Sequence, residues 1–387
     1  MASAAKNTQG NVVSQADFQA VLKERIREGV RETIETILDE ELDAFVGAGR
    51  YQRTGNRRDQ RNGHYTRDLS TNFGLIEDLE VPRSRQGFQT QVFDRYQRRQ
   101  TELDQSIGEM YIRGVSTRGV GDVVAALTGM KPSASTVSRI FHTLEDEYDT
   151  WKKRPLAAHY RYAFADGTYF TVKYENEGCK MPILAIIGIR DDGTREMLAF
   201  STGDRENQVA WTDLVQDIKS RGVATVDLWI TDGNQAMIGA IDAKFRESQR
   251  QRCVVHKIEN VLGYVPKQQQ EAVKPELKAI FYQDSRLQAE QVAAAFCAKF
   301  EKAYPTAIDC LKRDLDACLT FYAFPKVNWR TIRSSNVIER FFLEAKRRYH
   351  KMGAAYPNEN SCLLTFYAIV RTVKFHKVTM PTKDTAK

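Results

Sequence analysis

The amino-acid sequence predicts an α/β protein with a mixed β-sheet, preceded by a mainly α-helical N-terminal region and interrupted by an all-helical segment. Three observations predict this class. Helical spacing of apolar residues dominates before Trp151, strand-like runs dominate after Pro155, and helical spacing without a strand signal returns from His256 to Ala323. With 387 residues, 42% of them hydrophobic, the chain is long enough for two or three domains with ordinary cores.

The N-terminal region begins with an amphipathic helix. Apolar residues recur from Asp17 to Phe45 at the spacing that places them on one face of a helix. A basic stretch rich in Gly and Asn follows, and then two strand-like runs at residues 74–81 and 90–96, interrupted by Pro82 and Arg83. We assign residues 1–100 to this first module.

The stretch from Arg50 to Arg67 carries six arginines against the single acid Asp59, with tyrosine and histidine between them. Guanidinium groups pair bidentately with phosphate oxygens and displace counterions, so this composition suits a nucleic-acid backbone. A solvated, flexible basic loop has the same composition, and charge alone does not separate the two interpretations. The net charge of +7 is compatible with nucleic acid without proving it. The candidate DNA-binding residues of this stretch are Arg50, Arg53, Arg57, Arg58, Arg61 and Arg67.

Residues 101–155 form a predicted helical domain that contains a pair resembling a helix-turn-helix. One helix is expected from Thr117 to Leu127 and a second, capped by a serine, from Ser133 to Leu144, with a turn containing Gly and Pro between them. Such a pair either reads a DNA groove or is an ordinary part of a helical domain, because the motif is defined by shape. The side chains that the second helix would present to DNA are Ser135, Thr136, Ser138 and Arg139.

After Pro155 the predicted elements are a group of strand-like runs, then a helix, a strand, a helix and a strand. This is the order of a ribonuclease-H-like mixed sheet, although order alone is an argument by analogy. We assign residues 156–260 and 330–387 to this domain and residues 261–329 to an all-helical insertion. The strand-like runs are 162–165, 168–174, 181–189, 196–201, 226–231 and 251–255, and the helices are 206–219, 235–245, 335–352 and 361–374.

Two aspartates directly follow strand-like runs in this domain. Asp166 comes after Tyr162–Ala165, and Asp232 comes after Val226–Thr231. If these strands pair side by side, both carboxylates reach one place. Asp-Gly is also a favoured turn at strand ends, which explains either dipeptide without any function.

A third acid, Glu339, lies one turn inside a capped helix start. An acid there is normally an ordinary first-turn residue favoured by the helix dipole. Apolar neighbours mark a buried face beside it, so Glu339 can also point into a site at the edge of the domain. Lys346 lies two turns along the same side, where a base can hold the DNA backbone. Asn336, Arg340 and Lys346 are candidates for positioning near the site, and Arg347 and Arg348 are candidates for DNA binding.

Converging carboxylates suit phosphodiester chemistry. Cleavage needs a nucleophile from water or a 3′ hydroxyl, and it needs the charge on the phosphate oxygens to be neutralised. Two Mg²⁺ ions about 4 Å apart, or Mn²⁺ in their place, supply both, and carboxylates are the hard ligands that these ions prefer. Asp166, Asp232 and Glu339 are therefore the candidate catalytic residues and metal ligands, with Asp166 as the bridging one.

Cys253 and His256 form a Cys-x-x-His pair at the end of a predicted strand. The spacing is that of two ligands in a zinc site, but no second pair of matching spacing follows. We interpret the pair as structural or as positioning the substrate, and the sequence does not decide whether it binds metal. The six cysteines are scattered through one half of the chain and are expected to be reduced thiols.

The sequence has no apolar run near the roughly 20 residues of a membrane helix, and its N-terminus has no apolar core of a secretion signal. We therefore expect a cytoplasmic, nucleoid-associated protein without a membrane partner.

At these residues the sequence resembles the mutator-type bacterial insertion-sequence transposases, relatives of the plant mutator-like elements. The resemblance covers nearly the whole chain and depends on the order and separation of its pieces. These pieces are Asp39–Leu42, Arg57-Arg58, Val81–Arg83, Tyr96–Arg99, Met110–Gly114, Ser116–Arg118, Asp166, Thr231–Gly233, Gln251–His256 and Asn336–Arg340.

The resemblance implies a ribonuclease-H-like catalytic domain whose Asp, Asp, Glu triad is matched by Asp166, Asp232 and Glu339. It also implies an all-helical insertion before the glutamate, a Cys-x-x-His signature at Cys253 and His256, N-terminal recognition of terminal inverted repeats, and a homodimer. Two departures leave the triad intact. Serines 334 and 335 stand where the family usually has two threonines, and Arg205–Asn207 replaces a more acidic, glycine-rich stretch.

The function expected from these features is that of a DNA transposase, which binds its terminal repeats and cleaves and joins strands of double-stranded DNA with metal ions. Two alternatives remain open. A DNA-binding regulator would use the helix pair and the arginines with an inert sheet, and a ribonuclease-H-like nuclease would cut without joining. The repeat sequence, the target site and the choice between excision and copying do not follow from the sequence.

Overall fold

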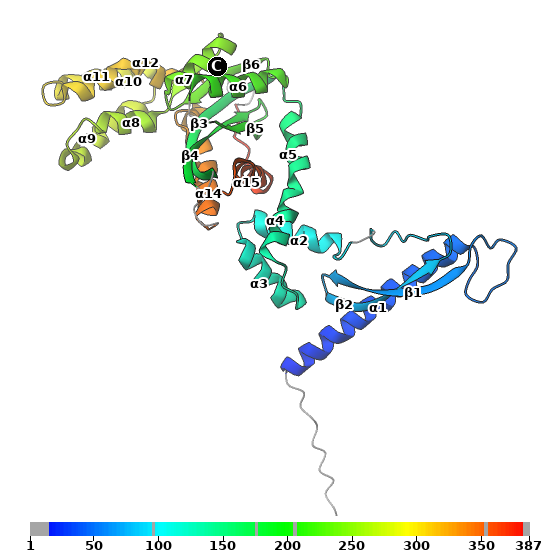
Figure 1. Cartoon of the computed structure of the whole chain (residues 1–387). Coiled ribbons are helices and arrows are strands. Elements are labelled where there is room, and N and C mark those ends of the chain that lie inside the picture. Colours follow the sequence, from blue (N-terminus) through cyan, green and yellow to red (C-terminus); the bar gives the residue numbers. More distant parts are fainter. Residues whose placement is uncertain (1–14, 95–96, 175–176, 204–206, 352–354, 382–387) are drawn as a thin grey trace, which may run out of the picture. The chain divides into compact units, whose positions relative to one another are not determined.

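The computed structural model describes residues 15–94, 97–174, 177–203, 207–351 and 355–381. Contacts within the chain group it into two compact units, whose elements are labelled in Figure 1. The N-terminal unit comprises residues 1–111 and 115–142, and the C-terminal unit comprises residues 112–114 and 143–387. Three predicted elements begin or end at residues 96, 206 and 352, which lie outside the described residues.

A long helix packs on a two-stranded antiparallel hairpin in the N-terminal unit. The helix is α1 (Gln15–Val46), and the hairpin consists of β1 (Arg61–Thr71) and β2 (Gly74–Ser84). Ile34 and Leu38 of α1 are buried against apolar residues of the hairpin. In its second half the apolar spacing of the predicted helix therefore faces a core, whereas Phe18, Val21 and Leu22 in its first half are exposed.

The hairpin differs from the two strands expected at 74–81 and 90–96. The run at 74–81 is a strand, but its partner is β1, which begins within the basic stretch. The expectation at 90–96 is wrong over its described part, because residues 90–94 form no strand. Sequence periodicity is weak in β1, since most of its side chains are polar and Leu69 is its one buried apolar residue among those described.

Three short helices complete the N-terminal unit around a core that includes Ile107 and Val120. They are α2 (Thr101–Ile112), α3 (Thr117–Thr128) and α4 (Ala134–His142). The hydroxyl of Ser133 accepts a hydrogen bond from the Thr136 amide at 3.1 Å, which caps the start of α4. Both helices of the predicted pair are therefore present, and the second ends two residues earlier than expected.

A five-stranded mixed sheet forms the centre of the C-terminal unit, in the spatial order β5-β4-β3-β6-β7. β4 is antiparallel to β3 and β5, whereas β6 is parallel to β3 and β7 is parallel to β6. The mixed sheet and the order of its elements along the chain agree with the α/β class predicted from the sequence. The strands are β3 (His159–Tyr174), β4 (Glu177–Ile189), β5 (Arg195–Thr202), β6 (Thr225–Thr231) and β7 (Gln249–Arg252).

β3 corrects one expectation about the first aspartate. Residues 162–165 and 168–174 were expected as separate runs with Asp166 at the end of the first, but they form one strand. Asp166 pairs with Ala185 and Gly167 pairs with Leu184 in β4. Asp166-Gly167 is therefore not a turn, because β4 pairs with β3 without interruption from Tyr162 to Tyr174.

Helices cover both faces of the sheet (Figure 1). α6 (Gln208–Ser220) and α7 (Gln235–Lys244) bury a core that contains Trp211 and Trp229. On the other face lie α14 (Asn336–Lys351) and α15 (Glu359–Thr372), and α5 (Leu144–Lys153) packs against α15. The rings of Phe170 in β3 and Phe366 in α15 meet edge to face, with centroids 5.2 Å apart.

A helical segment follows β7 and extends away from the sheet (Figure 1). Gln251 of β7 is fully buried at its base, where its side chain donates to the Cys318 carbonyl at 2.9 Å and accepts from the Phe321 amide at 2.8 Å. β7 ends at Arg252, earlier than expected, because Cys253 begins the next helix. The helices of the segment are α8 (Val254–Leu262), α9 (Lys267–Ala279), η1 (Ile280–Tyr282), α10 (Arg286–Phe300), α11 (Pro305–Arg313), α12 (Leu315–Cys318), η2 (Thr320–Ala323), η3 (Lys326–Asn328) and α13 (Trp329–Ile332).

Among the helices of the described residues, none combines the length and the apolar character that a membrane crossing requires.

Candidate active site

Three acidic side chains of the C-terminal unit interact through their charges: one in β3, one directly after β6 and one in α14. β3 and β6 run parallel and pair as far as Phe164 and Ile230, so Asp166 and Asp232 each lie two residues beyond that pair. Glu339 is in the first turn of α14, which contacts β3 and β4. The charges of Asp232 and Glu339 both act on Asp166. The fold thus brings the three acids of the sequence prediction into one electrostatic neighbourhood.

Asp166 is the most buried of these acids, with 8% of its surface exposed. Burial, and after it the charge of Asp232, raises the pKa of Asp166 from 3.8 to about 7. The Gly167 amide donates to its Oδ1 at 2.8 Å, which favours the charged form but does not offset the burial. An anion at this position is costly unless a cation lies beside it.

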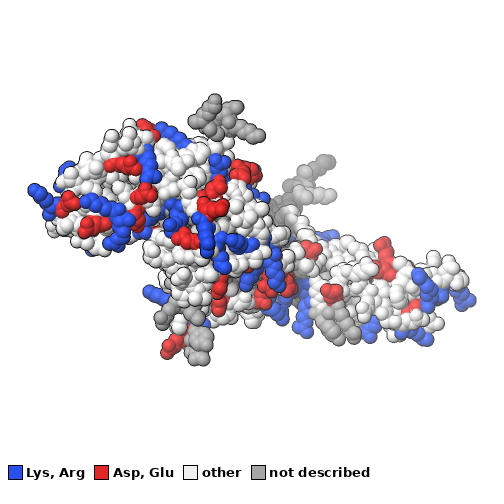
Figure 2. Space-filling view, turned by 90° about the horizontal axis from the view of Figure 1, so that it is seen from above, with Lys and Arg blue, Asp and Glu red and all other residues white. Residues whose placement is uncertain are grey.

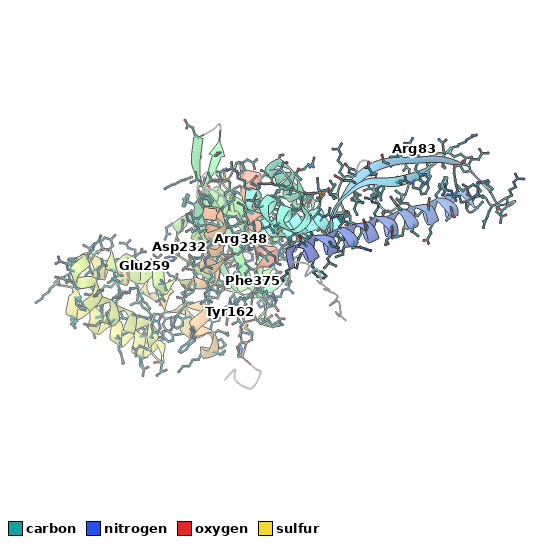
Figure 3. All side chains as sticks on the ribbon, turned by 90° about the horizontal axis from the view of Figure 1, so that it is seen from below. Arg83, Tyr162, Asp232, Glu259, Arg348 and Phe375 are labelled. Atoms are coloured by element: carbon teal, nitrogen blue, oxygen red, sulfur yellow. The ribbon has the colours of Figure 1, made fainter. Side chains whose placement is uncertain are left out.

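Asp232 is held by the turn between β6 and α7, and Figure 3 labels it in the C-terminal unit. The Asn234 amide donates to its Oδ1 at 2.8 Å. The Asn234 side chain in turn accepts from the Ala236 amide at 2.9 Å and caps α7. Because the same short turn caps the helix and binds the carboxylate, the direction of Asp232 is set by secondary structure.

Glu339 is oriented by a serine one turn before it. The Ser335 hydroxyl lies 2.5 Å from Glu339 Oε1 and 3.2 Å from Cys253 Sγ. A hydroxyl has one proton to donate, and the carboxylate is the stronger acceptor of the two. The Ser335 amide also donates to Cys253 Sγ at 3.3 Å. The start of α14 is therefore tied to the end of β7 through Cys253.

Cys253, His256 and Glu339 form a second group whose potential ligand atoms all lie within 4.8 Å of one another. His256 Nε2 is 4.0 Å from Glu339 Oε1. The Cys253 sulfur, and also the charges of Asp166 and Glu339, raise the pKa of His256 to about 9 despite its partial burial. Burial raises the pKa of Cys253, but His256 and Ser335 lower it by more. The histidine is thus a cation at neutral pH, directly beside the acidic residues.

The donor atoms of this region fit a hard divalent cation better than zinc. Asp166, Asp232 and Glu339 offer carboxylate oxygens. Burial, and after it the charge of Asp232, raises the pKa of Asp166, and a cation beside it would favour the charged form. Cys253 and His256 do not complete four tetrahedral ligands with residues of matching type in the described structure, where Glu339 is their one grouped partner.

The polar and basic residues predicted on α14 are exposed, with the exception of Arg348. Asn336, Arg340, Lys346 and Arg347 are exposed. Arg348 is buried: its guanidinium donates to the Ile112 carbonyl, and to the Thr372 hydroxyl at 2.9 Å. With these partners and Glu344 at 3.2 Å, Arg348 stabilises the packing of α14 and has no surface to offer to DNA in this conformation (Figure 3).

The arginines of residues 50–67 lie in the segment between α1 and β1 and in β1 itself. Arg50, Arg53, Arg57 and Arg58 are exposed, and Figure 2 shows Lys and Arg side chains gathered at this end of the N-terminal unit. Arg61 instead pairs with Asp43 and is partly buried. The guanidinium of Arg67 is 4.3 Å from the Phe93 ring centroid. The exposed arginines remain accessible to phosphates, whereas the other two also stabilise the hairpin.

Asp59, the acid within this stretch, is buried and hydrogen-bonded to the backbone. It is 6% exposed and accepts from the amides of Gln60, at 2.6 Å, and Gln86, at 3.1 Å.

On α4, Ser135, Ser138 and Arg139 are exposed and Thr136 is partly exposed, as the predicted recognition face requires.

Sequence reasoning missed two features of the site. The role of Ser335 follows from its position four residues before Glu339, the spacing that brings two side chains together on a helix. Gly233 has a φ of 89°, and a Cβ built there would lie 1.4 Å from Arg252 Nη1. Arg252 is held by Asp314 at 2.9 Å, so the chain leaves no space for a side chain directly after Asp232.

Comparison with known proteins adds an independent observation. The sequence pattern of the family described as "Transposase, Mutator family" matches residues 2–377. The chain belongs to this family of transposases.

Several insertion-sequence transposases are similar to it over most of their length. The transposase of element ISRM5 from Rhizobium meliloti is 32% identical over 359 residues, which cover 92% of this chain and 90% of the relative. The transposase of IS1201 from Lactobacillus helveticus is 33% identical, with 92% and 96% covered. That of IS256 in transposon Tn4001 from Staphylococcus aureus is 32% identical, with 89% and 90% covered. The resemblance expected from short motifs is thereby confirmed for this transposase.

Proposed function

We propose that this transposase cuts and joins DNA strands at Asp166, Asp232 and Glu339, with two Mg²⁺ or Mn²⁺ ions held by these carboxylates in a ribonuclease-H-like domain. The observation that carries the proposal is the environment of Asp166, a buried carboxylate on which the charges of the other two acids act. The antiparallel pairing of β3 with β4 and the parallel pairing of β3 with β6 support the fold assignment.

The residues of the chain have separate tasks in this proposal. The metal ions supply an activated nucleophile and neutralise charge on the phosphate oxygens. Asp166 would hold both ions from its buried position, and Asp232 and Glu339 would hold one each. The turn at Asn234 keeps Asp232 in place, as described above. His256, positively charged at neutral pH, can contact a phosphate oxygen of the DNA close to the acids.

The same site serves two successive steps. In the first, water attacks the phosphodiester at the transposon end, the P–O bond to the leaving 3′ oxygen breaks, and a free 3′ hydroxyl results. In the second, that hydroxyl attacks a phosphodiester of another strand and displaces its 3′ oxygen. Neither step needs a reactant other than water, the DNA and the released 3′ hydroxyl. The same three carboxylates are therefore sufficient for both steps.

We assign recognition of the terminal inverted repeats to the N-terminal unit. The exposed arginines after α1 and the exposed face of α4 support this assignment, the arginines through phosphates and α4 as the second helix of a helix-turn-helix in a groove. Because two transposon ends must be processed together, we infer a homodimer acting at the nucleoid in the cytoplasm.

A gel assay with labelled terminal DNA, with and without Mg²⁺ or Mn²⁺, tests the function. Wild-type protein should cleave and transfer strands only with metal, and Asp166→Asn should bind DNA without cleaving it. Asp213→Asn is the matched control, because Asp213 is exposed on α6. Metal-independent binding without cleavage by the wild type would favour the regulator, and cleavage without strand transfer would favour the nuclease. Retained cleavage by Asp166→Asn would overturn the assignment of the site.

A further inference from the structure

A pocket of about 700 Å³ lies next to the proposed active site in the C-terminal unit. Its wall includes Val254 and Asn336, the chain neighbours of Cys253 and Ser335, which contact each other beside Glu339. The Val254 amide donates to the Arg333 carbonyl at 2.9 Å and joins two sides of the wall. We call this the arginine pocket, for the side chains Arg195, Arg330, Arg333 and Arg340 that line it.

The charges of the arginine pocket are not balanced by the protein. No Asp or Glu is among its lining residues. Within the described part of the chain, none of the four arginines forms an ion pair or a side-chain hydrogen bond. Elsewhere in the same unit, arginines such as Arg252 and Arg286 pair with carboxylates. A protein of mixed surface charge therefore keeps four guanidinium groups unpaired in one pocket.

Arg195 of β5 shows the cost of this arrangement. Its Nε is inaccessible to solvent and has no hydrogen-bond partner among the described residues. Burial, and then the charge of Arg340, lowers the pKa of the Arg195 guanidinium. Buried donors without partners are rare in folded proteins, and crowded like charges disfavour the charged form. A polyanionic ligand in the pocket would relieve the crowding of like charges.

An aromatic ring forms part of the same wall. Tyr282 is 49% exposed, and the guanidinium of Arg333 lies over its ring, with Cζ 3.7 Å from the centroid. A half-exposed tyrosine with stacked arginine is a typical platform for an unpaired nucleic-acid base, which offers a flat face on either side. A free inorganic anion has no flat ring that could stack on Tyr282.

We propose that the arginine pocket binds the DNA strand adjoining the cleaved phosphodiester, with its arginines on backbone phosphates and one unpaired base against Tyr282. This proposal rests on the proposed function, because it takes the DNA strand to be cut at the three acids next to the pocket. It assigns Arg330, Arg333 and Tyr282 a part in substrate binding. It also assigns Arg340 to a backbone phosphate of the DNA and not to the metal site.

Binding measurements without divalent cations test the phosphate contacts separately from catalysis. Arg330→Gln combined with Arg340→Gln removes two exposed charges, and Arg313→Gln is a control for an exposed arginine at the end of α11. Fluorescence anisotropy with terminal DNA, over a series of salt concentrations, should show a log-log salt slope that is less steep by about 1–2 for the double variant. The control should keep the wild-type slope. An unchanged slope in the double variant would overturn the proposal.

Crosslinking tests the base contact. DNA carrying 5-iododeoxyuridine at successive positions around the cleavage site should crosslink to the Tyr282 peptide from positions next to the cleaved bond. Tyr282→Leu should lose this crosslink and weaken binding on the order of tenfold. Crosslinks from this peptide to distant repeat positions only would contradict the proposal. So would stabilisation by inorganic phosphate alone that is lost in the double variant, since that indicates a small-anion site.

The two proposals fail in different ways. If Asp166→Asn cleaves DNA but the salt slope still depends on the arginine pocket, the acids have been assigned wrongly and the pocket binds DNA. If Asp166→Asn is inactive and the double variant binds with the wild-type slope, the site is right and the pocket has another role.

Discussion

Replacing Asp166 by Asn should make the metal-free transposase more stable, although it removes a residue proposed for catalysis. Asp166 is 8% exposed, and its pKa is raised from 3.8 to about 7 by burial and by Asp232. In the unfolded chain the carboxyl returns to its ordinary pKa. The folded state therefore binds this proton more tightly than the unfolded state does.

The sign and size of the effect follow from that difference. The stabilising contribution of the protonated carboxyl is fully present below pH 3.8 and is lost as the pH rises through about 7. Because one pKa unit corresponds to about 1.4 kcal/mol, the loss in the free energy of unfolding approaches 4 kcal/mol at pH 8, as an order of magnitude. Asn has no such loss, so the advantage of Asp166→Asn should grow by roughly 3 kcal/mol between pH 5 and pH 8.

Urea unfolding at pH 5 and pH 8, followed through the fluorescence of the buried Trp211 and Trp229, measures this advantage. Excess Mg²⁺ should raise the midpoint of the wild type at pH 8 and leave that of Asp166→Asn nearly unchanged, since the ligand is gone. Asp213→Asn should match the wild type in all conditions. The reasoning is refuted if the advantage of Asp166→Asn is the same at both pH values, or if Mg²⁺ stabilises both proteins equally.

Three further substitutions test how the site is supported. Ser335→Ala removes the hydrogen bond that orients the first-turn glutamate of α14, and single-turnover cleavage should slow by about tenfold at unchanged DNA affinity, which a normal rate would contradict. Gly233→Ala places a Cβ against the arginine at the end of β7 at a φ of 89°, and we expect a loss of at least about 2 kcal/mol in the free energy of unfolding, measured in urea. Gln251→Leu leaves a buried carbonyl and a buried amide without partners, at a cost of about 2–4 kcal/mol, and unchanged stability would show that the helical segment does not depend on this contact.

The sequence alone predicted the α/β class of the fold, and it singled out three acids whose charges interact in the structure. Apolar spacing predicts α1, and the alternation of strands and helices predicts the order from β3 to β7, because these patterns depend on local geometry. Asp232 could be placed from its strand and turn, since both are signals of a few neighbouring residues. The family could be recognised from motifs because their order survives in a sequence about 30% identical to its relatives.

Properties that depend on partners distant in the chain were not predictable. The strand partner of β2 was misplaced because its pairing with β1 is decided by packing under α1 and not by periodicity. Asp166 was expected at a strand end, since a single sequence cannot show that β4 continues beside it. Arg348 was predicted to bind DNA because it is basic and lies among other basic residues. Only the tertiary structure shows that its guanidinium is hydrogen-bonded inside the protein, to Ile112 and Thr372.

By itself, then, the sequence determined which residue types this transposase has available and where most of its helices and strands lie, because these are properties of short segments. The tertiary structure decided which of those residues meet. The pKa of Asp166 is raised to about 7 because the fold buries this carboxyl and, after that, because the charges of Asp232 and Glu339 act on it. Likewise, Arg195 of β5 and Arg330 of α13 stand far apart in the chain, and only the tertiary structure brings them to one pocket.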